Sequence, residues 1–181
     1  MRYLILVALF LPIAASGQSG DRGRTSSTAR GSFQTAGLPS VPEPIIAPEV
    51  PVLEGLPHAV RVGYTVYVSA MVPLDSAGRL VGPGDLGMQV RQAVRNLAAV
   101  MRAAHGVPGD VVRATVYLRD LTPEKVAIVR DAVLDGLDRA SPPALTVVGV
   151  SAFADPGIEV TIDATGQLRS EFPDRDRARK P

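Results

Sequence analysis

The residue types that most often carry out chemistry are scarce in this sequence. It has no cysteine, which excludes disulfides, thiolate catalysis and cysteine-based metal sites. Its 2 histidines, His58 and His105, lie far apart and in no metal-binding spacing. The stretch Gly82-Pro83-Gly84 lacks the lysine and the Ser or Thr of a phosphate-binding loop. We therefore expect no metal ion and no cofactor.

Among the carboxylates, Glu159 lies in the most regular surroundings. Ile158, Val160 and Ile162 alternate with Glu159 and further polar residues, which is typical of a strand with one face in water. From this pattern alone, Glu159 is an ordinary surface carboxylate.

The overall composition argues against several classes of partner. The formal net charge is +1, aromatic residues make up 4% of the chain, and tryptophan is absent. We therefore do not expect a nucleic-acid binder that relies on net charge or on aromatic stacking. The length of 181 residues suggests one domain.

Residues 1–17 have the pattern of a secretory signal peptide. Arg2 is followed by the apolar run Tyr3–Ala15, and Ala15-Ser16-Gly17 offers the small residues of a cleavage site. The run is too short for a stable membrane span, which needs about 20 residues. We expect a periplasmic or secreted protein. The alternatives are an uncleaved interfacial anchor and a wrongly chosen start codon.

Residues 18–51 are predicted to form a disordered tether. They are rich in Ser, Gly, Thr, Arg and Pro and have almost no periodic apolar pattern. Residues 167–181, a tail of mixed charge, are also expected to be disordered. One domain, residues 52–166, remains between them.

The pattern of that domain predicts an α+β fold with the order β-β-α-β-α-β-β. One helix is expected between Asp85, as its N-cap, and Gly106, as a C-terminal glycine with positive φ; the other begins at Thr122-Pro123. Because strands outnumber helices, both helices should pack on one face of a single sheet. The other face needs cover, and self-association is the simplest way to provide it. The expected strands are residues 59–62, 65–70, 111–118, 144–150 and 158–164.

Several segments, in matching order and with similar gaps, resemble the Rid family of imine deaminases, also called YjgF-like or endoribonuclease L-PSP proteins. The segments are V-Y-V-S-A-M-V-P-L-D (66–75), Q-V-R-Q-A-V-R-N-L-A-A-V-M-R-A-A-H-G (89–106), V-V-R-A-T-V-Y-L-R-D (111–120), P-A-L-T (143–146) and G-I-E-V (157–160). The resemblance implies a chorismate-mutase-like fold and a homotrimer with small-molecule clefts between subunits. It also implies hydrolysis of 2-imino acids to 2-keto acids and ammonia.

The resemblance also implies which residues form the site. Family members grip the substrate carboxylate with an arginine and position the attacking water with a glutamate. Glu159 stands at the glutamate position and is the expected catalytic residue, whereas Leu145 stands at the arginine position. The expected substrate-binding positions are Leu145, Thr146 beside it, Ser69 in the S-A-M-V-P run, Leu56 at a tyrosine position and Arg130 at an asparagine position.

Leu145 leaves the function open. A guanidinium binds a carboxylate through two charge-assisted hydrogen bonds, each worth roughly 1.5–3 kcal/mol, and leucine makes neither. We expect an exported homotrimer whose altered cleft binds or acts on a different, less anionic small molecule. The alternatives are a non-catalytic ligand-binding or assembly module and an active 2-iminobutanoate/2-iminopropanoate deaminase that uses a substitute arginine, Arg61 or Arg113. Ribonuclease activity, suggested only by the older family name, is least expected, because no basic groove is visible.

Overall fold

A computed structural model describes residues 41–53 and 55–169 of the chain. The predicted signal peptide, residues 18–40 of the predicted tether and residues 170–181 of the predicted tail lie outside these ranges. In the described part of the chain, no helix combines the length and the apolar character that crossing a membrane requires.

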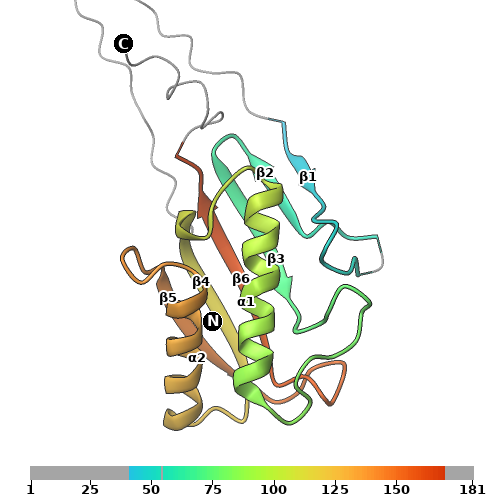
Figure 1. Ribbon diagram of the computed structural model, residues 1–181, viewed down its shortest axis with the longest axis vertical. Coiled ribbons are helices and arrows are strands. Elements are labelled where there is room, and N and C mark those ends of the chain that lie inside the picture. Colours follow the sequence, from blue (N-terminus) through green and yellow to red (C-terminus); the bar gives the residue numbers. More distant parts are fainter. Residues whose placement is uncertain (1–40, 54, 170–181) are drawn as a thin grey trace, which may run out of the picture. The chain divides into compact units, whose positions relative to one another are not determined.

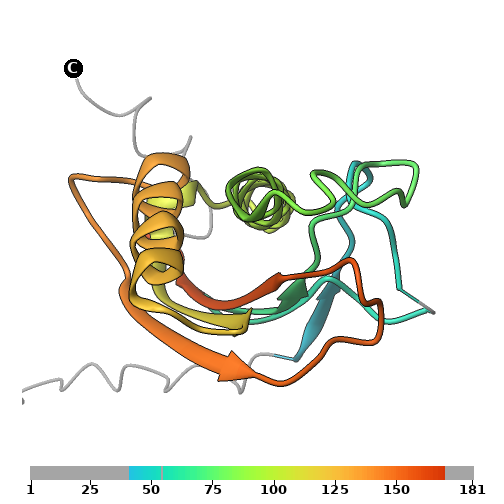
Figure 2. The same cartoon turned by 90° about the horizontal axis from the view of Figure 1, so that it is seen from below.

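The described residues form a 6-stranded sheet with two α-helices over one of its faces (Figures 1 and 2). The strand order across the sheet is β1-β2-β3-β6-β4-β5; β4 and β5 are parallel, and every other neighbouring pair is antiparallel. The predicted α+β fold is therefore confirmed. The elements are β1 (Glu43–Ile45), β2 (Ala59–Val62), β3 (Thr65–Met71), α1 (Leu86–Ala103), a 3-10 turn (Pro108–Asp110), β4 (Val111–Arg119), α2 (Pro123–Gly136), β5 (Ala144–Val150) and β6 (Val160–Gln167).

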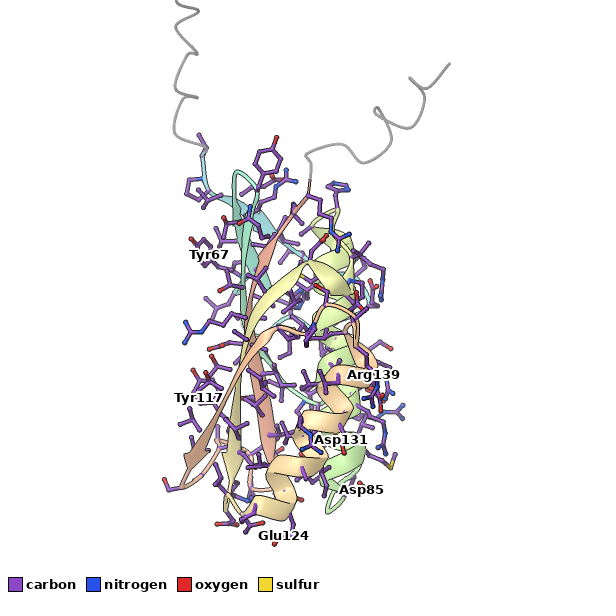
Figure 3. All side chains as sticks on the ribbon, turned by 90° about the vertical axis from the view of Figure 1, so that its left-hand side faces the viewer. Tyr67, Asp85, Tyr117, Glu124, Asp131 and Arg139 are labelled. Carbon is purple, nitrogen blue, oxygen red and sulfur yellow. The ribbon has the colours of Figure 1, made fainter. Side chains whose placement is uncertain are left out.

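The core lies between the sheet and the helices. Val116 of β4 and Ile162 of β6 are paired in register and are both fully buried on the helix-covered face. α1 contributes Leu97 and Met101, which are also fully buried. Side chains in a strand alternate between the two faces, so their neighbours in sequence point to the other side of the sheet. We call that uncovered side the open face; Tyr67 and Tyr117 project from it, away from the helices (Figure 3).

The folded region begins earlier than the predicted boundary at residue 52. β1 pairs with β2, and Ile45, Ala47 and Val50 are buried, so this part of the predicted tether belongs to the domain. The buried His58 holds it in place: the Ala47 N–H donates to Nδ1 at 3.0 Å. Because Nδ1 accepts, the neutral ring carries its proton on Nε2, which donates to the Pro51 carbonyl at 3.2 Å.

Two C-terminal boundaries also differ from the predictions. α1 ends with His105 in the positive-φ conformation (65°), not with Gly106. Gly106 is needed for another reason: a Cβ there would lie 2.6 Å from a methyl carbon of Leu168. The last strand runs on through Gln167, and Leu168 is buried, so the domain includes the first residues of the predicted tail.

Candidate functional site

Glu159 lies at the end of the sheet where β6 begins and where both helices start (Figure 1). Asp155 forms the preceding turn, since its carboxylate accepts from the Gly157 N–H at 2.7 Å. The turn brings Glu159 beneath the first turns of α1 and α2, where its side chain is only 14% exposed. The residue thus belongs to a partly buried cluster and is not an ordinary surface carboxylate.

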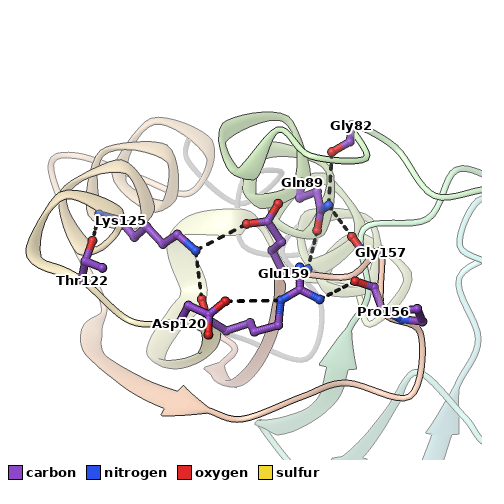
Figure 4. A network of polar contacts seen from close by, with 9 residues as sticks. Gly82, Gln89, Asp120, Thr122, Lys125, Pro156, Gly157 and Glu159 are labelled. Carbon is purple, nitrogen blue, oxygen red and sulfur yellow. Dashed lines mark hydrogen bonds and ion pairs between the residues drawn. The ribbon is translucent and has the colours of Figure 1, made fainter.

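Gln89, in the first turns of α1, fixes the backbone of Glu159 (Figure 4). Its side-chain oxygen accepts from the Glu159 N–H at 2.8 Å. Its side-chain nitrogen donates to the carbonyl of Gly157 at 2.9 Å and to that of Gly82 at 3.1 Å. Gln89 is completely buried, so these three bonds are shielded from water. One side chain therefore ties the start of β6 and the loop before α1 to the helix.

Among the described residues, Lys125, in the first turn of α2, forms an ion pair with Glu159. Its Nζ lies 3.6 Å from Glu159 Oε2 and donates to the Arg119 carbonyl oxygen at 3.2 Å. The Arg119 N–H in turn donates to the Glu159 carbonyl at 2.9 Å, and its guanidinium donates to the Pro156 carbonyl. The ends of β4, β6 and α2 are thus linked around one carboxylate (Figure 4).

Both helix N-termini at this end are capped by side chains. Asp85 accepts from the Met88 N–H at 2.9 Å in α1, and the Thr122 hydroxyl accepts from the Lys125 N–H at 3.3 Å in α2. In the same turn of α2, the N–H of Glu124 itself and the Thr122 hydroxyl hold the pKa of the Glu124 carboxyl below its usual value. The caps keep the turn that carries Lys125 in a defined conformation.

The structure does not bring Leu145 to Glu159 within one chain. Leu145 is paired with Ala114, and Glu159 is level with Arg119, at the other end of β4. From Ala114 to Arg119 the strand advances about 17 Å, at about 3.3 Å per residue. The Leu145 side chain is half-buried and packs against the core on the helix-covered face.

Thr146 and Ser69 come together on the open face instead. Both line a shallow hollow of about 680 Å³, which Tyr117 and Asp163 also line. The Tyr117 hydroxyl donates to Asp163 Oδ2 at 2.9 Å. This hydrogen bond, and then the negative charge of Asp163, raise the pKa of Tyr117 above its usual value.

The two remaining predicted positions lie apart from Glu159. Leu56 is 67% exposed and, together with Ser69, lines a pocket of about 240 Å³ beneath the N-terminal segment. Arg130 lies on the exposed surface of α2 and pairs with Asp131 at 2.8 Å. Within one chain, the six predicted positions are therefore distributed over four places, with Arg130 outside all of them.

Gln89 and Lys125 are the site residues that the sequence reasoning missed. Gln89 carries a usable signal, because it is a polar residue within the buried stripe of a predicted amphipathic helix. Lys125 carries none, since its contact with Glu159 depends on how α2 packs beside the end of β6. Among residues 41–53 and 55–169, His, Asp and Glu side chains form no group of three that could hold a metal ion. The chemistry available at Glu159 is that of a carboxylate that accepts a proton from water beside a cation.

Comparisons with known proteins place this arrangement in context. The model of the family described as endoribonuclease L-PSP matches residues 49–167. A RutC family protein from Sulfurisphaera tokodaii is 36% identical over 64 residues, which cover 35% of this chain and 51% of that protein. The 2-iminobutanoate/2-iminopropanoate deaminase of Mus musculus is 42% identical over 65 residues, covering 35% and 47%. The chain thus spans about half the length of the curated relatives it matches.

The fold has close counterparts among solved structures. That of RidA from the Antarctic bacterium Psychrobacter sp. PAMC 21119 superposes with a TM-score of 0.63 at 29% sequence identity. The match covers 70% of this chain and 99% of the other.

Proposed function

This chain belongs to the endoribonuclease L-PSP family, and on that premise we propose that it is an exported homotrimer that hydrolyses the C=N bond of small imines in an altered cleft. The position and restraint of Glu159 carry the proposal. The Glu159 carboxylate is 14% exposed, its backbone is held by Gln89 and its side chain lies beside Lys125. A carboxylate restrained in this way is suited to accept a proton from an attacking water. The mammalian relatives named as imine deaminases support the reaction class.

In the proposed reaction, water adds to the carbon of a protonated imine. The new C–O bond forms, the C=N electron pair moves to nitrogen, and Glu159 accepts the water proton. That proton passes to the nitrogen, the C–N bond breaks, and ammonia leaves while Glu159 accepts the hydroxyl proton and the carbonyl forms. The ammonia then takes this proton from Glu159 and departs as ammonium. General-base assistance of this kind is typically worth 10²–10⁴-fold in rate, by order of magnitude.

The separation of Leu145 from Glu159 supports a cleft built from more than one copy. The two residues lie about 17 Å apart along the strand direction, too far for a small imine to touch both in one chain. β5 is an edge strand with Thr146 and Val148 exposed, and no helix of the described residues covers the open face beside it. If three copies cover one another's open faces, the β5 edge of one copy lies against its neighbour. A cleft between the two copies can then draw residues from both.

The cleft is altered because Leu145 is apolar and packs against the core. A substrate carboxylate would find no hydrogen-bond donor in that side chain. We therefore propose that substrate binding does not depend on a carboxylate grip at residue 145. The signal-peptide pattern of residues 1–17 supports export of the protein.

The test measures imine decay with purified protein. An amino-acid oxidase generates 2-iminobutanoate, and an amine oxidase generates a neutral imine of similar size. We expect the protein to accelerate decay of at least one imine, and Glu159→Gln to abolish the acceleration. We expect Leu145→Arg to raise turnover of 2-iminobutanoate relative to the neutral imine. Decay of both imines at the rate seen in buffer would leave only the binding or assembly module.

The trimer has its own measurement. Light scattering of the purified protein should give three times the mass of one chain. A monomeric mass would remove the cleft between copies and, with it, any contribution of Leu145 to the site of Glu159.

A further inference from the structure

We propose that Lys125 binds the anionic group of the substrate and so provides from α2 the charge that Leu145 cannot provide from β5. The inference rests on the proposed imine hydrolysis and adds the residue of this chain that would hold the anionic group of the substrate. It also replaces the expectation that a substitute cation would be an arginine.

The hydrogen bonds of the Lys125 ammonium leave room for a ligand. An ammonium has three N–H donors, and one of them goes to the Arg119 carbonyl at 3.2 Å. The distance of 3.6 Å to Glu159 Oε2 is an ion-pair distance, beyond that of a normal N–H···O hydrogen bond. An incoming carboxylate can therefore take a donor from Lys125 without displacing a protein hydrogen bond.

The ammonium is both fixed and accessible. The Arg119 carbonyl holds Nζ, and the Thr122 cap holds the Lys125 backbone N–H, so little side-chain freedom remains to be lost on binding. The side chain nevertheless keeps 27% of its surface exposed, against 14% for Glu159. A small molecule can reach the cation from solvent while lying against the carboxylate.

Three arginines that could provide the charge instead are already paired or lie far from Glu159. Arg61 forms two bonds with Glu43 on β1, at 2.6 and 3.1 Å. Arg113 pairs with Ala144, at the Leu145 end of β4 and β5. Arg119 directs its guanidinium to the Pro156 carbonyl and lies 3.8 Å from Asp120. In the described part of the chain, Lys125 thus combines nearness to Glu159 with free donors.

The spacing of the pair fits a 2-imino acid. In such a molecule the carboxylate carbon and the imine carbon are bonded, about 1.5 Å apart, as two adjacent carbons are in a protein backbone. A ligand that places its carboxylate on Lys125 therefore has its imine carbon within reach of water held by Glu159, because the two protein groups are 3.6 Å apart. Both substrates in the name of the mouse relative are carboxylates, which agrees with this class.

The experiment measures binding of 2-oxobutanoate, a stable carboxylate, and of its neutral amide, by NMR titration of the full chain. We expect Lys125→Met to weaken 2-oxobutanoate binding by about 10- to 100-fold, as for loss of one charge-assisted hydrogen bond, and to leave amide binding unchanged. Lys125→Arg should restore most of the affinity. The control is Arg139→Gln, which removes an equal charge just beyond the C-terminal end of α2, where Arg139 pairs with Asp135 at 2.5 Å.

The outcomes separate this inference from the proposed function. If 2-oxobutanoate binding requires Lys125 but no imine is hydrolysed, the role of Lys125 as the anion-binding residue (the anion anchor) stands and the hydrolase proposal fails. If 2-iminobutanoate is hydrolysed with the same KM by wild type and Lys125→Met, the hydrolase stands and the anchor is wrong. Failure of the wild-type protein to bind 2-oxobutanoate, or equal binding by Lys125→Met, would also overturn the anchor.

Discussion

Replacing Gln89 with leucine should release the turn that positions Glu159. The substitution keeps the size of a completely buried side chain but removes all of its polar atoms. The Glu159 N–H loses its acceptor, and the carbonyls of Gly82 and Gly157 lose their shared donor. Because α1 and β6 remain packed through their apolar residues, the helix and the sheet should keep their places while the turn at 155–159 becomes free to move.

The expected cost follows from those three hydrogen bonds. Each is worth about 1 kcal/mol net, so Gln89→Leu should lower the free energy of unfolding by about 3 kcal/mol. For a domain of this size, about 3 °C in Tm is lost per kcal/mol, which gives a fall of about 9 °C. The apolar surface that leucine buries offsets part of this fall, since burying one CH₂ stabilises by about 0.8 kcal/mol.

The assay combines thermal unfolding with amide hydrogen exchange followed by NMR. Gln92→Leu is the matched control: on the same helix, the Gln92 side chain donates to the Leu74 carbonyl at 3.0 Å and to Asn96 at 2.9 Å, away from the Glu159 turn. Both variants should lose stability, but only Gln89→Leu should speed exchange of the Glu159 amide under native conditions. If the Glu159 amide is as protected from exchange in Gln89→Leu as in the wild type, Gln89 does not hold the turn at 155–159, whatever the change in Tm.

Two further predictions concern the open face and the helix pair. Asp163→Asn should bring the titration of Tyr117, followed by NMR, back toward the ordinary tyrosine value of about 10. A tyrosine whose pKa is raised in the folded state stabilises the fold fully below about pH 10, and this contribution is lost as pH rises through the folded-state pKa. The stability of Asp163→Asn should therefore differ most from that of the wild type at neutral pH. An unchanged Tyr117 titration in the variant would contradict the hydrogen bond. Gly136→Ala should destabilise the domain by up to about 2 kcal/mol in chemical denaturation, because the added Cβ would overlap a methyl carbon of the buried Val94. Overpacking of this kind costs about 1–3 kcal/mol, against a helix-propensity gain of about 1 kcal/mol. A more stable Gly136→Ala protein would show that propensity decides at this position.

The fold could be predicted where one face of each element is buried. The α1 stripe and, from Ala114 onward, the β4 alternation follow directly from their periods of 3.6 and 2, and both helix starts are marked by capping side chains. At the start of β4 a register shift overrides the period, so that Val111 is buried and Val112 is exposed. The N-terminal segment was missed because its prolines interrupt any period, although Ile45, Ala47 and Val50 are as buried as core residues. What holds that segment is a pair of hydrogen bonds to the ring of His58, which no local pattern reveals.

The site was harder to predict for a related reason. Glu159 was identified by its place in a matching segment, but its environment was not. Its partly buried state depends on Gln89, 70 positions earlier in the chain, and on the turn after β4 that brings Lys125 to it. A long side chain in the first turn of a helix can point in many directions, and its partner is set by which strand end lies beside it. Spacing in sequence cannot supply that information.

The register of the sheet bears most directly on function. β5 runs parallel to β4 and β6 runs antiparallel to it. Leu145, near the start of β5, is therefore level with Ala114 in the first half of β4, whereas Glu159, just before β6, is level with Arg119 at its end. A glutamate side chain cannot cover the intervening distance of about 17 Å. A site that uses both residues therefore takes them from different copies of the chain, whereas Lys125 and Glu159 meet within one copy. In the proposed trimer, an arginine at position 145 would come from a neighbouring copy, so its absence would leave the proposed pair of Glu159 and Lys125 within one copy unaffected.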